Sequence, residues 1–135
     1  MSGVSGTTFP KSAHLLKHAD FQHVYQNGKR HFSGNLTAFY LRRDSGDGVS
    51  PVRVGFTVGK VLGGAVERNR IRRRTREAVR FHLDDLRGIS DSVDIIIHPK
   101  KSVLNIDFCV LSEEVGRAFQ VVRRSVERRG KASAE

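Results

Sequence analysis

A run of arginines on a helical pattern is the feature that most constrains this chain. Residues 67–80 contain seven arginines and two glutamates, so this stretch carries half of the net charge of +10. The longer segment 65–86 has good helix formers and neither proline nor glycine, which predicts one long helix. One side of that helix collects residues that can pack on a sheet. They are Ile71, Thr75, Ala78, Val79, His82 and Leu86.

The arginines of this predicted helix form a fixed array beside the packed side. Planar guanidinium groups make bidentate hydrogen bonds to phosphates and stack on bases. A face that is only solvated usually mixes charges of both signs, whereas acids are scarce here. We therefore predict that this helix binds a nucleic-acid backbone. An adjoining face gathers Asn69, Arg72, Arg73, Arg76 and Arg80, and Arg70 and Arg74 project beyond it.

The composition of the whole chain favours a small nucleic-acid-binding domain. In 135 residues, 24 lysines and arginines stand against 14 acids, and such an excess favours a polyanionic partner. No apolar run approaches the roughly 18 residues of a membrane span, and the N-terminus lacks an apolar signal core. We therefore expect a cytoplasmic protein without a membrane partner. Cys109 is the only cysteine, which excludes an intramolecular disulfide and predicts a buried structural thiol.

Alternation of apolar residues predicts strands on both sides of the arginine helix. Residues 35–42 alternate, and so do residues 52–58, which follow a turn-rich stretch at 44–51. Together they predict an antiparallel hairpin with a loose loop. A third strand is expected at 93–98, ending at Pro99. In the first strand one face carries Leu36, Ala38 and Tyr40, and the other carries Thr37, Phe39 and Leu41.

Two further helical patterns flank these strands. Apolar spacing predicts a short helix over 18–26, and Asn27-Gly28 is a stop signal. Near the C-terminus, Ser112 resembles an N-cap because acids follow it in the first turn. The stripe of this last helix is Val115, Ala118, Phe119, Val122 and Val126.

These elements predict a single-domain α/β fold. The expected order is helix, strand, strand, helix, strand, helix, and the first strand region can split into two strands. The domain is expected to span 13–128. The ends, 1–12 and 129–135, are poor in apolar residues and are predicted to be disordered tails.

No complete catalytic or metal site is predicted from the residues. The segment from Gly55 to Lys60 resembles a phosphate-binding loop, but its glycine spacing is short and Val61 follows where Ser or Thr is needed. Asp84 and Asp85 are adjacent on a helix and therefore point in different directions. The histidines lack ligand partners at metal-binding spacing. We expect no catalytic residue, no metal site and no cofactor that the protein alone requires.

Two segments resemble the protein subunit family of bacterial ribonuclease P. They are RVGFTVGK at 53–60 and GGAVERNRIRRRTREAVR at 63–80, and Arg68-Asn69-Arg70 within the second is similar to the signature of that family. The resemblance extends over about 15–128. It places this triplet on the predicted helix, after a strand and a glycine turn.

The resemblance implies a fold and a role. The fold is an α-β sandwich whose central sheet has a left-handed βαβ crossover, against the general right-handed rule. The family subunit joins a large catalytic RNA, and the particle cleaves precursor tRNA to remove the 5′ leader. The RNA performs the hydrolysis with Mg²⁺ that it mainly binds itself. The protein, not catalytic alone and without an obligate protein partner, binds the catalytic RNA and the leader.

The resemblance also assigns two sets of residues. The aromatic set should line a cleft for unpaired leader nucleotides, although Phe21 and Tyr25 are also spaced as core residues of a helix. A shift of one residue would exchange Phe39 with Tyr40 at the cleft, and this choice stays open. Val61 and Gly64 stand where the family often has polar residues. The RNA-binding set is Lys60, Arg68, Asn69, Arg70, Arg72, Arg73 and Arg76, and the leader-cleft set is Phe21, Tyr25 and Phe39.

Three other functions are compatible with a basic chain. An architectural or ribosomal-type RNA-binding protein with no role in cleavage would show the same salt-sensitive binding. A DNA-binding protein is less favoured because no helix-turn-helix is evident. A ribonuclease made of protein alone is also disfavoured, since no acidic cluster is available to hold metal.

Overall fold

Four strands and three helices make up the described part of the chain, residues 18–43, 52–86 and 92–134 of a computed structural model. Side chains are described from Ala19 to Val126 within these ranges. The elements are α2 (His18–Asn27), β1 (Lys29–Phe32), β2 (Leu36–Arg43), β3 (Val52–Phe56), α3 (Ala65–His82), β4 (Ser92–Pro99) and α4 (Phe108–Ala134). Short 3-10 turns cover Lys60–Leu62, Leu83–Leu86 and Lys101–Leu104.

The domain limits stay a prediction. The expected N-terminal tail, 1–12, and the loop at 44–51 lie outside the described residues. The expected C-terminal tail, 129–135, overlaps the last turns of α4.

The sheet has the order β1-β2-β4-β3, so β4 lies between β2 and β3. It pairs antiparallel with β2 and parallel with β3. The expected antiparallel hairpin of 35–42 with 52–58 is therefore wrong. The physical reason lies in β4, where every residue except His98 is buried. A strand that is buried on both faces belongs in the centre of a sheet that helices cover on both sides.

An extra strand, β1, lies at one edge of the sheet. Its sequence, Lys29–Phe32, is mostly exposed and charged, which is typical of an edge strand and gives little alternation to detect. It pairs antiparallel with β2. The mixed α/β class is confirmed, with this strand added before the first one expected. The parallel strands β3 and β4 are joined through α3, and the hand of that crossover stays a prediction.

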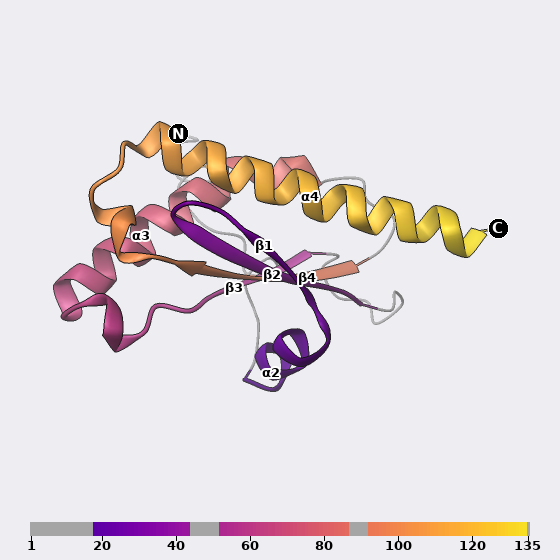
Figure 1. The fold of residues 1–135 in the computed structure, drawn as a ribbon, viewed down its shortest axis with the longest axis horizontal. Helices are drawn as coiled ribbons and strands as arrows, with labels where there is room; N and C mark the ends of the chain where they lie inside the picture. Colours follow the sequence, from indigo (N-terminus) through magenta and orange to yellow (C-terminus); the bar gives the residue numbers. More distant parts are fainter. Residues whose placement is uncertain (1–17, 44–51, 87–91, 135) are drawn as a thin grey trace, which may run out of the picture.

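Helices cover both faces of the sheet, with α3 and α4 on one side and α2 on the other (Figure 1). The predicted stripes of α3 and α4 are confirmed, except that His82 is half-buried and Leu86 lies in the 3-10 turn after α3. Ile71 and Phe119, for example, are fully buried against the sheet. The alternation of β2 is also confirmed, and Tyr40 faces this core with 7% of its surface exposed. Phe39 consequently faces α2.

Both ends of the α3–α4 connection differ from expectation. The helix over 65–86 ends at His82 and continues as a 3-10 turn. The last helix begins at Phe108, where the backbone carbonyl of Asp107 accepts the first hydrogen bonds, rather than after Ser112. Phe108 and Leu111 extend the apolar stripe toward the N-terminus, which explains the earlier start. Cys109, predicted to be buried, lies exposed in this first turn.

Ser112 serves inside α4 as a partner of α3. Its Oγ is hydrogen bonded to Nε2 of His82 at 2.9 Å, and Nδ1 of the same ring lies 2.8 Å from a carboxylate oxygen of Asp85. A Cβ added at Gly116 would lie 2.9 Å from Cε1 of His82. Because Gly116 has no side chain, the imidazole of His82 can lie directly on α4. Its contact with Ser112 then connects α3 with α4.

Glu114 ties the β1–β2 turn to α4. Its carboxylate accepts hydrogen bonds from Ser33 Oγ at 2.6 Å, from the backbone N–H of Asn35 at 2.8 Å and from the Asn35 side-chain amide. Burial raises the pKa of Glu114, but these hydrogen bonds and the charge of Arg117 outweigh it, so the pKa lies below its ordinary value. The ionised carboxylate thus holds the edge hairpin against the helix.

Replacing Gly63 with alanine is expected to lower stability by about 1–3 kcal/mol, because its backbone conformation is one that only glycine adopts readily. Gly63 has φ 135° and ψ −166°, and an added Cβ would meet the Glu67 carboxylate that accepts the N–H of Gly64. Urea unfolding measures the change. Gly59→Ala is the matched control, since its φ is −86° and a Cβ there meets nothing within 4 Å. Equal stability of the two variants would contradict the prediction.

Candidate nucleic-acid interface

The solvent-facing side of α3 carries a dense set of cations. The packed side of the helix is buried, so the charged side chains are directed outward from the domain. Two of these side chains, Arg68 and Arg72, are half-buried. Exposed members are Asn69, Arg70, Arg73 and Arg76, with Lys60 exposed just before the helix. We call these seven residues the arginine surface.

Two arginines of α3 are engaged within the protein instead. Arg74 donates hydrogen bonds to the carbonyls of Val103 and Ile106, both at 2.7 Å, and so closes the turn before α4. Arg80 is paired with Glu77 one turn earlier. The hydrogen bond from Arg80 lowers the pKa of Glu77, which keeps this carboxylate ionised. The arginine surface therefore excludes the two residues whose guanidinium groups already have partners.

A second cluster, on the opposite side of the sheet, is aromatic. The ring of Tyr25 lies 6.4 Å from Phe21 and 5.0 Å from Phe39, both in edge-to-face arrangements. Tyr25 is 38% exposed, and the other two rings are half-buried. Arg30 of β1 lies over Phe39, with its guanidinium carbon 5.7 Å from the ring centre. The structure thus brings together the three residues that the sequence assigned to a leader cleft, from α2 and β2.

His98 is a member of this cluster that the sequence did not single out. Its ring lies 4.8 Å from Phe39, and its Nε2 is hydrogen bonded at 2.5 Å to the Tyr25 hydroxyl. The same hydroxyl is hydrogen bonded to Oγ1 of Thr57 at 2.8 Å. Burial lowers the pKa of His98, which favours the neutral ring. No sequence pattern signalled it, because the pairing of Thr37 with His98, which puts His98 on the face of Phe39, is decided by the tertiary structure.

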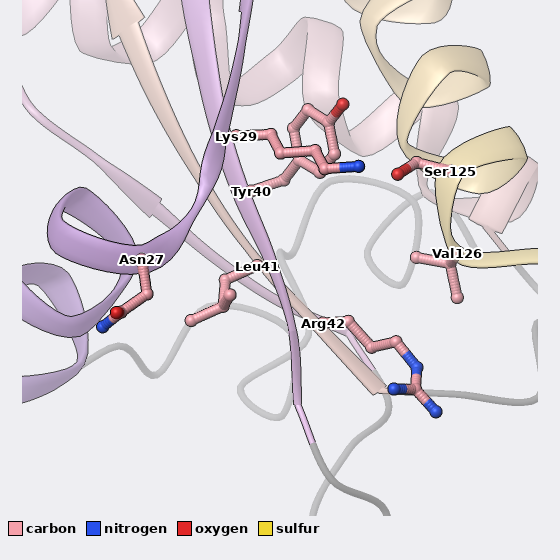
Figure 2. Close-up of a pocket in the computed structure, with 7 residues that line it drawn as sticks. All are labelled: Asn27, Lys29, Tyr40, Leu41, Arg42, Ser125 and Val126. Carbon is pink, nitrogen blue, oxygen red and sulfur yellow. The ribbon is translucent and has the colours of Figure 1, made fainter. Parts of the chain in front are cut away.

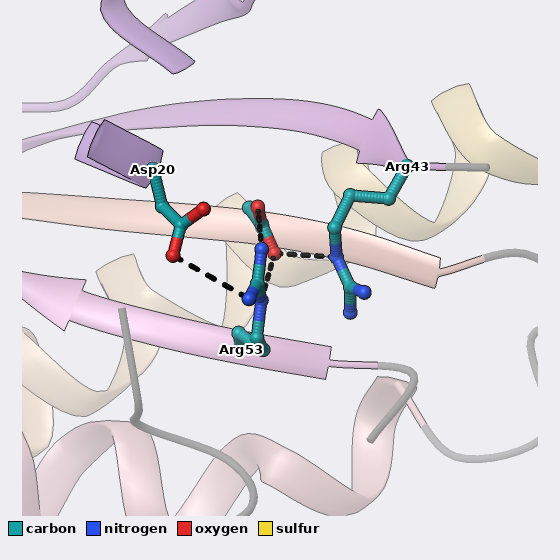
Figure 3. A network of polar contacts seen from close by, with 4 residues as sticks. Asp20, Arg43 and Arg53 are labelled. Atoms are coloured by element: carbon teal, nitrogen blue, oxygen red, sulfur yellow. Dashed lines mark hydrogen bonds and ion pairs between the residues drawn. The ribbon is translucent and has the colours of Figure 1, made fainter. Parts of the chain in front are cut away.

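A buried ion network holds α2 on this face (Figure 3). Asp94 of β4 is 2% exposed and accepts two hydrogen bonds from Arg53 of β3, at 2.8 and 2.7 Å. Arg43 of β2 lies 2.6 Å from the same carboxylate. Arg53 also reaches Asp20 of α2 at 3.4 Å. The network therefore connects three strands with the helix that carries Phe21 and Tyr25.

A small pocket of about 160 Å³ lies at the edge where β1 and β2 approach α4 (Figure 2). None of the residues in the two predicted sets lines it. The lining residues are Asn27, Lys29, Tyr40, Leu41, Arg42, Ser125 and Val126. Across the described ranges, no group of three or more His, Cys, Asp or Glu side chains could hold a metal ion. In those same ranges, no helix is long and apolar enough to cross a membrane.

Comparisons with known proteins agree on one family. Residues 9–123 match the family described as Ribonuclease P. A protein of Desulforapulum autotrophicum named ribonuclease P protein component is 34% identical over 87% of this chain and 95% of its own length. One of Brucella suis with the same name is 40% identical over 76% of this chain and 74% of its own.

Solved structures show the same fold. The RNase P protein of Staphylococcus aureus matches with a TM-score of 0.63 and 23% identity, over 83% of this chain and 96% of that one. The RNase P protein of Thermotoga maritima matches with a TM-score of 0.64 and 23% identity, over 78% of this chain and 94% of that one. The four-stranded sheet and its helices are thus an arrangement shared with these proteins.

Proposed function

The chain belongs to the ribonuclease P protein family, and from this premise we propose that its two surfaces bind two different RNA segments in the holoenzyme. As a protein component of ribonuclease P it is a subunit of the ribonucleoprotein that processes precursor tRNA. We assign the arginine surface to the catalytic RNA and the aromatic cluster to the 5′ leader. Family membership decides against the architectural alternative with no role in cleavage.

The observation that carries the first assignment is the exposure of the arginine surface. Four of its residues, including Arg70 and Arg73, are exposed on one rigid helix. A helix whose opposite side is buried keeps its cations at constant spacing, as binding to successive phosphates requires. The assignment of Lys60, Arg68 and Arg72 to the same contact rests on their place beside these residues.

The aromatic cluster supports the second assignment. Single-stranded nucleotides bind where exposed aromatic rings offer a stacking surface beside a cation. Tyr25 offers an exposed ring and Phe39 a half-buried one, and Arg30 lies over Phe39. The precursor tRNA is thus the proposed second partner, and its unpaired leader is the segment that suits an aromatic cluster of this kind.

The chemistry is assigned to the RNA. In this proposal the catalytic RNA carries out the hydrolysis and binds most of the Mg²⁺, in the cytoplasm, without an obligate protein partner. The protein contributes positive charge and a leader contact. The positive charge supports the binding and folding of the catalytic RNA, and the leader contact supports the binding of the precursor tRNA.

The first experiment is cleavage of a precursor tRNA at moderate salt and low Mg²⁺ by the cognate RNA alone, the protein alone, and both together. We expect removal of the leader at one site only when both are present, because the cations of the protein replace part of the metal requirement. Efficient cleavage by the RNA alone with no gain on adding protein would contradict the proposal. Cleavage by the protein alone would contradict the assignment of the chemistry to the RNA.

The leader contact has its own test in neighbouring residues of β2. Phe39→Leu removes a ring from the cluster, and Tyr40→Phe changes the next residue, which faces the opposite core. We expect Phe39→Leu to weaken binding of substrates with a leader by about 1–3 kcal/mol, and of substrates without one hardly at all. Tyr40→Phe should bind both substrates like the parent protein. Unchanged binding of both substrates by Phe39→Leu would place the leader elsewhere, and equal losses on both would indicate a folding defect.

A further inference from the structure

A hollow of about 390 Å³ lies between α3 and the start of α4. Its volume is within the range of pockets that hold small organic groups, roughly 300–1,000 Å³. It is separate from the aromatic cluster, which lies on the other face of the sheet. The lining residues are Arg70, Arg73, Arg74, Glu77 and Phe108.

The apolar part of this hollow is an aromatic ring. Phe108 is half-buried, and its ring centre lies 5.9 Å from that of Phe81 in an edge-to-face arrangement. Phe81 is 57% exposed, and the guanidinium carbon of Arg80 lies 4.7 Å from its ring centre. Two aromatic rings, the exposed Phe81 of α3 and the half-buried Phe108 of α4, therefore lie beside the arginine surface.

The polar groups around the hollow are positioned before any ligand arrives. Two backbone carbonyls hold the guanidinium of Arg74, and Arg80 holds the carboxylate of Glu77. Arg70 and Arg73 are exposed and can reach outward to phosphates. A flat ring, a fixed carboxylate that accepts hydrogen bonds and two free-standing cations are the elements that recognise a nucleotide.

We propose that this hollow binds one unstacked base of the catalytic RNA, a base with an exocyclic amino group. The base stacks on Phe108, its amino group donates a hydrogen bond to Glu77, and the flanking phosphates contact Arg70 and Arg73. Uracil has no amino group, and its only base-edge donor, N3–H, lies between two carbonyl oxygens that repel a carboxylate, so uracil is disfavoured. The proposal rests on the proposed function, since it takes the catalytic RNA as the partner of α3. It adds a base contact to what would otherwise be phosphate binding only.

The test uses the full-length protein and the cognate ribonuclease P RNA. Phe108→Leu keeps the apolar volume but loses the stacking surface, and Phe108→Tyr keeps the ring. We expect Phe108→Leu to bind the RNA roughly 5- to 100-fold more weakly, as for loss of one base–aromatic stack. The dependence of affinity on salt should stay unchanged, because stacking releases no counterions. Phe108→Tyr should bind like the parent protein.

Chemical probing of base edges on the RNA locates the contact. The parent protein and Phe108→Tyr should protect one unpaired adenine, cytosine or guanine that becomes reactive again with Phe108→Leu. Parental affinity and an unchanged protection pattern with Phe108→Leu would overturn the proposal, and so would a protected uracil. If the parent protein did not bind this RNA at all, the result would contradict the proposed function itself. If Phe108→Leu does not fold, Glu77→Ala, which removes the proposed hydrogen-bond acceptor in the lining of the hollow, decides by the same protection pattern.

Discussion

Changing Arg70, Arg73 and Arg76 together to glutamine is expected to lower the salt dependence of RNA binding by roughly 2 to 3 in the slope of log K against log salt. Each phosphate contact contributes about 0.7 to 0.9 to that slope through the counterions that it releases. The three side chains are exposed, and glutamine is a good helix former, so the fold should be kept. Affinity for the catalytic RNA at several salt concentrations is the measurement.

A matched control separates a specific surface from overall charge. Lys101, Arg117 and Arg124 are also exposed but lie outside α3. Their triple glutamine variant removes the same charge, and we expect its slope to fall by less than about 1. If the slope fell equally in both variants, RNA binding would depend only on the net charge of the protein. That result would contradict the assignment of the arginine surface.

Asp94→Ala is expected to destabilise the protein by about 3–5 kcal/mol, the cost of breaking a buried ion pair by removing one partner. The carboxylate of Asp94 is 2% exposed, and two arginines from neighbouring strands contact it. Without it, Arg43 and Arg53 keep their charges in a half-buried place with no shared carboxylate. Urea or thermal unfolding with circular dichroism measures the loss.

The control for Asp94 is an exposed pair on α4. Glu113 and Arg117 lie 2.7 Å apart with 67% and 69% of their side chains exposed, and such a pair contributes only about 0–1 kcal/mol. Glu113→Ala should therefore leave stability nearly unchanged. A loss below about 1 kcal/mol for Asp94→Ala as well would mean that packing alone holds the three strands together.

The ion network also connects stability with the proposed leader contact. Asp20 follows the start of α2, and Phe21 and Tyr25 lie on the same helix, so the contact with Arg53 helps to place both rings on the sheet. Loss of this anchor would move the aromatic cluster but not the arginine surface, which belongs to the opposite layer. The two proposed RNA-binding surfaces can thus be perturbed separately.

Local periodicity was sufficient for most of the elements, though not for β1 or for the ends of α3 and α4, and for one of the two surfaces. The stripe from Ile71 to Val79 predicted which side of α3 is buried, and the cationic residues on the remaining sides followed from helix geometry alone. The alternation of β2 likewise placed Phe39 and Tyr40 on opposite faces. These properties depend on neighbours within a few residues, and such neighbours can be read directly in the sequence.

Contacts between distant residues were decided only by the tertiary structure. Periodicity could not say that β4 inserts between β2 and β3, because pairing depends on which strand is covered on both faces. Nor could it say that Arg74 closes the turn before α4, or that His98 meets Tyr25 across 73 positions of the chain. Hydrogen bonds and ring contacts of this kind act over a few ångströms in space. Only the folded chain brings their partners within that range.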